Sequence, residues 1–174
     1  ATQITSKLYS EFAQPKNLKF ISYSYQDLDW AQNLINTLLE DQELLDLLQS
    51  PNRGGKENAR ATCPSVERCH SSQPFSNRAG KSFVIAGYSP TRLENEGETK
   101  GLLQSHEFTH VIQQSQFIGS SRELRGLASI KEFLPWWLVE GGADFGGIAS
   151  INHNSYEDYL RGRMNNVMWT PKKD

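Results

Sequence analysis

Two histidines and a glutamate within five consecutive residues restrict this chain more than any other feature. The segment is His106-Glu107-Phe108-Thr109-His110. Residues four apart lie on one face of an α-helix, so both histidines can reach a single tetrahedral metal ion if the segment is helical. Glu107 is rotated by about 100° from His106 around such a helix, which places its carboxylate beside the metal and not on it. A carboxylate in that position can take a proton from a water that the metal activates.

A second segment offers a third metal ligand. It runs from Pro135 to Phe145 with the sequence PWWLVEGGADF, and Glu140 stands in it among apolar and small residues. A carboxylate in such surroundings is costly to bury without a partner. Gly141 and Gly142 weaken a helix, which is reasonable only if another helix packs closely there. Asp144, one turn beyond Glu140, can accept the free ring N–H of a histidine ligand.

The two segments together resemble the gluzincin zinc peptidases, in which a His-Glu-x-x-His helix is completed by a glutamate on a later helix. The resemblance is specific at the two motifs and covers roughly residues 81–150. It implies zinc as the cofactor and a peptide or protein as the substrate. The residues that match the zinc ligands are His106, His110 and Glu140. Glu107 matches the general base, and Asp144 matches the residue that supports a ligand histidine.

Individual positions argue against two other groups of zinc peptidases. Metzincins would place a third histidine at position 116, where this chain has Gln116. No amine-anchoring motif of the aminopeptidase kind, such as Gly-x-Met-Glu-Asn, occurs in the chain. We therefore expect an endopeptidase.

The resemblance also suggests residues outside the two motifs. In such enzymes the strand before the active-site helix commonly binds substrate as an added strand, although an ordinary core strand would have the same sequence pattern. The matching residues here are Phe83, Val84, Ile85, Ala86 and Gly87. Family members stabilise the oxyanion with a tyrosine or histidine downstream of the ligands. The candidates are His153, Tyr156 and Tyr159, and each could equally be a surface or core residue.

The rest of the chain predicts one α+β domain, with a small mixed or antiparallel sheet packed on the active-site helix. Alternating apolar residues predict strands, over 17–25 and 81–88. Apolar residues at helical spacing or after capping signals predict helices, over about 27–49, 99–117, 120–130, 135–149 and 156–164. The polar residues 51–80 predict a long loop. A length of 174 residues fits a single domain.

Charge and hydropathy argue against two classes of partner. The formal net charge is −2 and the basic residues are scattered, which gives no reason to expect nucleic acid. No run approaches the roughly 20 apolar residues of a membrane span. Cys63 and Cys69 either close a small disulfide loop or remain two free thiols. These cysteines and an N-terminus without Met lead us to expect a secreted or periplasmic protein.

Two other functions are compatible with the same residues. One is a zinc hydrolase that acts on a non-peptide amide, and the other is a non-catalytic zinc-binding or interaction module on the same scaffold. Glu107 argues against the module, because a purely structural zinc site has no use for a general base.

Overall fold

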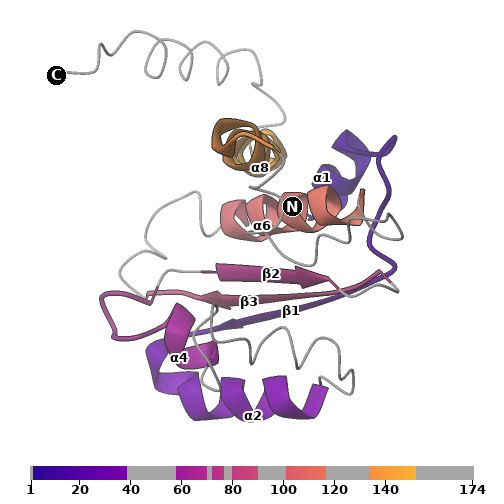
Figure 1. Ribbon diagram of the computed structural model, residues 1–174. Coiled ribbons are helices and arrows are strands. Elements are labelled where there is room, and N and C mark those ends of the chain that lie inside the picture. Colours follow the sequence, from indigo (N-terminus) through magenta and orange to yellow (C-terminus); the bar gives the residue numbers. More distant parts are fainter. Residues whose placement is uncertain are drawn as a thin grey trace, which may run out of the picture.

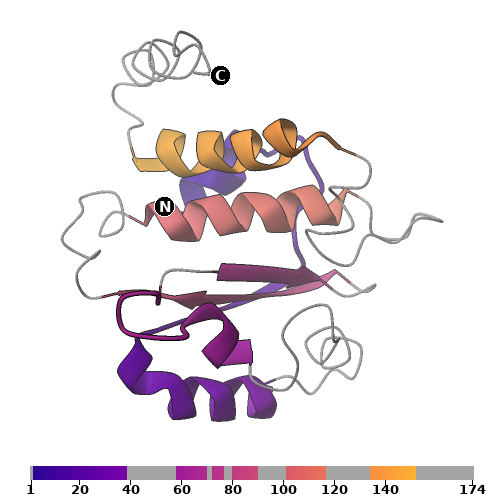
Figure 2. The same cartoon turned by 60° about the vertical axis from the view of Figure 1, so that its left-hand side comes forward.

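The computed structural model describes residues 2–38, 58–69, 72–76, 80–89, 101–116 and 134–151. Within them the chain is α+β, with a three-stranded sheet between helices (Figure 1). Helices α2 (Leu28–Leu38) and α4 (Asn58–Thr62) cover one face of the sheet, and α6 (Leu102–Ser115) covers the other. Helix α8 (Trp136–Ile151) lies on α6 on the side away from the sheet, and α1 (Thr2–Leu8) packs against both (Figure 2).

The sheet is mixed, with the strand order β1-β3-β2. Strand β1 (Asn17–Tyr23) pairs with β3 (Lys81–Gly87) in parallel, whereas β2 (Ser72–Ser76) pairs with β3 antiparallel. The central strand β3 therefore has partners along both edges. The predicted α+β class and the predicted small mixed sheet are confirmed.

One face of the sheet carries the main apolar core. Successive side chains of a strand point to opposite faces, so every second residue of the three strands faces α2 and α4. The buried strand residues of this cluster are Ile21, Tyr23, Phe75, Phe83 and Ile85. They pack against the helix residues Leu28, Ala31, Ile35 and Ala59 and against Cys63 and Cys69. The alternate residues Val84 and Ala86 are also buried and face the layer formed by α6.

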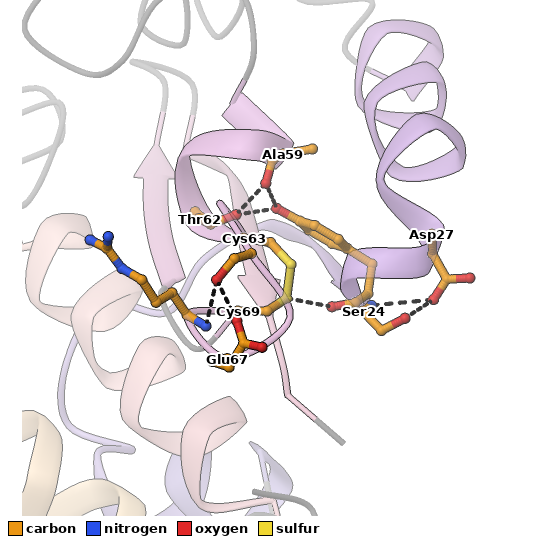
Figure 3. The surroundings of a disulfide bond; sticks show 10 residues. Ser24, Asp27, Ala59, Thr62, Cys63, Glu67 and Cys69 are labelled. Atoms are coloured by element: carbon orange, nitrogen blue, oxygen red, sulfur yellow. Dashed lines mark hydrogen bonds between the residues drawn. A yellow bond between two sulfur atoms is a disulfide. The ribbon is translucent and has the colours of Figure 1, made fainter. Parts of the chain in front are cut away.

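Cys63 and Cys69 form a disulfide at the edge of this core (Figure 3). Both cysteines are fully buried, and Gly87 at the end of β3 lies directly against them. A β-carbon at Gly87 would come within 3.1 Å of Cys63 Cβ and Cys69 Sγ, so only glycine fits there without a shift. Of the two states that the sequence left open for these cysteines, the structure contains the disulfide.

Tyr23 connects β1 to this region. Its hydroxyl donates to the carbonyl oxygen of Ala59 at 2.6 Å and also contacts Thr62 Oγ1 (Figure 3). Burial raises the pKa of Tyr23 to about 12, and the hydrogen bond with Thr62 offsets part of that rise.

The predicted strands and the three longer predicted helices are present, with bounds that differ by a few residues: both strands and α6 are shorter than predicted, whereas α8 continues to Ile151. The strands end at Tyr23 and Gly87, and the two helices that carry the motifs are α6 and α8. The helix predicted over 27–49 begins at Leu28 and is described as far as Leu38. Its remainder, and the helices predicted over 120–130 and 156–164, lie outside the described residues.

The prediction of a continuous loop over 51–80 is wrong. Helix α4 and strand β2 both lie within it. Strand β2 has the polar sequence SQPFS, and it is held by its ladder with β3 and by a hydrogen bond of 3.0 Å between Ser76 Oγ and Ser82 Oγ. Tertiary pairing, and not local propensity, makes this segment a strand.

Candidate metal centre

The two helices that carry the motifs approach each other through glycines. A β-carbon at Gly146 would overlap with Thr109 Oγ1, and one at Gly147 would lie 3.1 Å from the carbonyl oxygen of Leu102. Gly142 in turn leaves room for the side chain of Gln113, whose Nε2 would be 3.0 Å from a β-carbon there. Gly142, Gly146 and Gly147 therefore lower the intrinsic stability of α8 and allow the close helix contact that the site requires.

This contact brings three potential metal ligands together. The Nε2 atoms of His106 and His110 are 3.1 Å apart, and Glu140 Oε2 lies 3.5 Å from the first and 3.4 Å from the second. Tetrahedral coordination with bonds of about 2.0–2.1 Å requires ligand atoms about 3.3–3.4 Å apart. The three measured distances bracket that value, so His106, His110 and Glu140 could hold a metal ion.

Each imidazole is oriented by a hydrogen bond to its other nitrogen. His106 Nδ1 lies 3.1 Å from Asp144 Oδ1, and His110 Nδ1 lies 2.9 Å from Gln113 Oε1. Such hydrogen bonds fix the ring orientation of ligand histidines and raise their basicity. With Nδ1 occupied in both rings, the two Nε2 atoms are left to face the shared position beside Glu140.

The surrounding carboxylates also change the proton affinity of His106. Burial alone would lower the pKa of this imidazole, but hydrogen bonds to Asp144 and Glu140 and the charge of Glu107 raise it to about 9. Several negative charges are therefore gathered around a small volume. This concentration of negative charge favours a bound cation.

Glu107 occupies the position predicted for a base. Its side chain is buried, with 5% of its surface exposed, and its Oε1 is 3.9 Å from His106 Nε2. The hydroxyl of Ser72 on β2 donates to that same oxygen. The other oxygen, Oε2, is buried and has no hydrogen-bond partner in the described part of the chain. One oxygen is thus held in place while the other remains available to a group in the site.

The structure brings five of the predicted site residues together. They are His106, Glu107, His110, Glu140 and Asp144. The candidates His153, Tyr156 and Tyr159 lie outside the described residues. Sequence reasoning missed Gln113 and Ser72. Gln113 had a signal, because it is three residues after His110 on the same face of the helix, whereas nothing in the sequence connects Ser72 to Glu107.

The prediction that Phe83, Val84, Ile85, Ala86 and Gly87 bind substrate is wrong. Strand β3 is paired on both edges, with β1 and with β2, so it has no free edge for an added strand. Its side chains are also buried, in the core on one face and beneath α6 on the other. The sequence alternative of an ordinary core strand is the one observed.

Comparisons of the chain with protein-family models, with curated proteins and with solved structures find no match. No helix among the described residues is long and apolar enough to cross a membrane. The functional assignment therefore depends on the chemistry of the site itself.

Proposed function

We propose that the protein is a zinc-dependent endopeptidase of the gluzincin type, with a zincin-like catalytic domain. The position of Glu107 carries this proposal. It is a buried carboxylate beside three metal-ligand atoms, and one of its oxygens has no partner among the described residues. A site that held a metal only for stability would have no use for such a group.

The donor set supports zinc in preference to other ions. Two imidazoles and one carboxylate form a common ligand set of catalytic zinc sites, which keep a fourth position open. Calcium and magnesium prefer oxygen ligands and higher coordination numbers. When bound, zinc would supply Lewis acidity, which polarises a carbonyl group and lowers the pKa of water.

The chain's own residues would perform the remaining steps of peptide hydrolysis. Glu107 would accept the proton of the attacking water on its unpaired oxygen and deliver it to the leaving amine. Ser72 keeps the carboxylate directed into the site through its hydrogen bond to Oε1. Asp144 and Gln113 hold the two imidazoles in the orientation that a metal requires. The candidates for the oxyanion donor are His153, Tyr156 and Tyr159.

Strand β2 replaces β3 as the proposed binding surface for an extended peptide. No strand pairs with the outer edge of β2 in the described ranges, and its first residue, Ser72, contacts Glu107. Backbone pairing with a strand edge binds peptides with little dependence on their sequence. Pairing would involve the Ser72 end, because the carbonyl oxygen of Pro74 already accepts from Gln114 Nε2.

The disulfide between Cys63 and Cys69 supports an extracytoplasmic location. Disulfides persist in oxidising compartments and are rare in reducing ones. We therefore propose a secreted or periplasmic peptidase.

Three variants test the assignment. Glu107→Gln should retain about one zinc per chain and lose hydrolysis of a peptide library, by about 100-fold or more, because the base is removed and the ligands are not. His110→Ala should lose both zinc and activity. The control is Glu11→Gln, which makes the same chemical change at an exposed residue far along the chain and should alter neither property.

The measurements are elemental analysis for zinc and mass spectrometry of the library products. Full activity in Glu107→Gln would disprove the mechanism. Wild-type protein that holds no zinc after zinc is added at neutral pH would disprove the metal centre, and zinc without any hydrolysis would favour a non-catalytic module.

A further inference from the structure

The side chain of Gln113 connects the two halves of the metal centre. Its Oε1 lies 2.9 Å from His110 Nδ1 on its own helix, and its Nε2 donates to the carbonyl oxygen of Val139 on α8 at 2.9 Å. Val139 directly precedes the ligand Glu140. We propose that Gln113 is a positioning residue that sets the ring tautomer of His110 and ties His110 to the turn that carries Glu140. This inference rests on the metal centre proposed above and adds a residue to it.

The carbonyl group of Val139 determines how the Gln113 carboxamide is oriented. A backbone carbonyl only accepts hydrogen bonds, so the amide NH2 group must face Val139. The amide oxygen must then face His110 Nδ1, and because that oxygen also only accepts, Nδ1 must carry the hydrogen. The assignment follows from hydrogen-bond chemistry and does not depend on distinguishing oxygen from nitrogen in the side chain.

A hydrogen on Nδ1 leaves the other ring nitrogen of neutral His110 with a free electron pair. That atom, Nε2, faces His106 Nε2 at 3.1 Å and Glu140 Oε2 at 3.4 Å, which is the metal position. The opposite tautomer would direct a hydrogen at the metal, and the ring would have to exchange its proton before it could bind. Gln113 therefore prepares His110 as a ligand before the metal arrives.

The same bridge limits the movement of α8 relative to α6. Gln113 also borders an apolar cavity of about 280 Å³ between α6, α8 and the segment that follows α1, so packing alone does not hold its carboxamide in place. The hydrogen bond to Val139 does so, and Gly142 provides the space for it. At Gly141, by contrast, a β-carbon would have no atom of the described residues as a neighbour within 4 Å, so no such contact there requires this glycine.

The first test uses three substitutions, two at Gln113 on α6 and one at Gln116 directly after it. Gln113→Met keeps the length of the side chain and removes both hydrogen bonds, whereas Gln113→Glu keeps an acceptor for His110 Nδ1. Gln116→Met is the matched control, because Gln116 directly follows the same helix and bonds to Ala13 and Ile112, away from the metal ligands. The readouts are the histidine tautomers of the metal-free protein, from ¹⁵N spectra at mildly alkaline pH, and zinc affinity, from competition with a chromophoric chelator.

We expect the Nδ1–H tautomer of His110 in wild type, in Gln113→Glu and in Gln116→Met. Gln113→Met should populate the other tautomer and bind zinc about 10- to 100-fold more weakly, as found when hydrogen-bond partners of ligand histidines are lost. Gln113→Glu should recover most of that loss. A residue with a purely structural role would change the unfolding temperature and leave the tautomer and zinc affinity as they are.

The second test uses the adjacent glycines of α8. Gly142→Ala should displace the carboxamide from Val139 and weaken zinc binding, whereas Gly141→Ala should leave zinc affinity unchanged. Two results would overturn the inference: an Nε2–H tautomer of His110 in metal-free wild type, or equal zinc affinity in Gln113→Met and wild type. Absence of zinc binding in wild type would instead refute the proposed metal centre, and the tautomer measurement would still decide the role of Gln113.

Discussion

Replacement of Gly146 by alanine should separate the two helices that form the metal centre. A β-carbon at this position would overlap with Thr109 Oγ1 and lie 3.2 Å from Thr109 Cβ and 3.1 Å from Tyr9 Cε2. Thr109 cannot turn its hydroxyl away without loss, because the hydroxyl donates to the carbonyl oxygen of Ser105 at 2.9 Å. The clash must therefore be relieved by rotation of Thr109, which breaks this hydrogen bond, or by movement of α8, which also carries Glu140.

The magnitude follows from three contributions. Overpacking of a buried contact costs about 1–3 kcal/mol, and loss of the Thr109 hydrogen bond would add about 1 kcal/mol. Exchange of glycine for alanine inside a helix returns about 1 kcal/mol. We expect the free energy of unfolding of Gly146→Ala to fall by about 1–3 kcal/mol. For a chain of this size that corresponds to a melting temperature lower by about 2–12 °C.

Gly141→Ala is the matched control for the helix propensity. In the ranges that the structure describes, no neighbouring atom lies within 4 Å of a β-carbon at Gly141, so this variant should gain up to about 1 kcal/mol. Urea denaturation of both variants measures the difference, and Thr109→Ala combined with Gly146→Ala should restore part of the loss. A Gly146→Ala protein as stable as Gly141→Ala would refute the close helix contact.

Three further predictions concern other parts of the structure. Asp144→Asn should weaken zinc binding about 10-fold in chelator competition, because the group that supports His106 loses its charge. Tyr23 should keep its proton in the folded protein up to pH about 12. The unfolded chain releases that proton near pH 10. The contribution of Tyr23 to the free energy of unfolding is therefore fully present below pH 10 and falls by up to about 1.4 kcal/mol per pH unit between pH 10 and pH 12. Denaturation of wild type and of Tyr23→Phe over this pH range measures the slope. Replacement of both Cys63 and Cys69 by alanine should lower the free energy of unfolding by about 2 kcal/mol in urea denaturation, since their short loop is no longer closed.

The candidate metal ligands could be predicted because helix geometry is local. His106 and His110 share a face of any helix that contains them, and the same holds for Glu140 and Asp144. Only the meeting of the two helices had to be inferred, and a glutamate among apolar and small residues indicated it, although of the two glycines that follow Glu140 only Gly142 lies at the helix contact.

The arrangement of the sheet could not be predicted in the same way. The apolar run of β3 is typical of a buried strand, but the run does not reveal which strands lie beside it. Strand β2 has too few apolar residues to be recognised, and its existence depends on pairing with β3. The contact between Ser72 and Glu107 depends on that pairing, so it could not be predicted from the sequence either.

Because the disulfide is buried, the rate at which it is reduced should depend on how often the surrounding core opens. Thiol–disulfide exchange requires a thiolate to reach a sulfur atom, and Cys63 and Cys69 are both fully buried beneath Gly87 in the core that β1 and α2 complete. A reductant can therefore reach the sulfur atoms only in molecules in which the packing of β1 and α2 around the disulfide has opened. At moderate thiol concentration the reduction rate would report the population of that opened state. The rate of reduction of the Cys63–Cys69 disulfide thus measures how often the layer opens that lies across the sheet from the proposed metal centre.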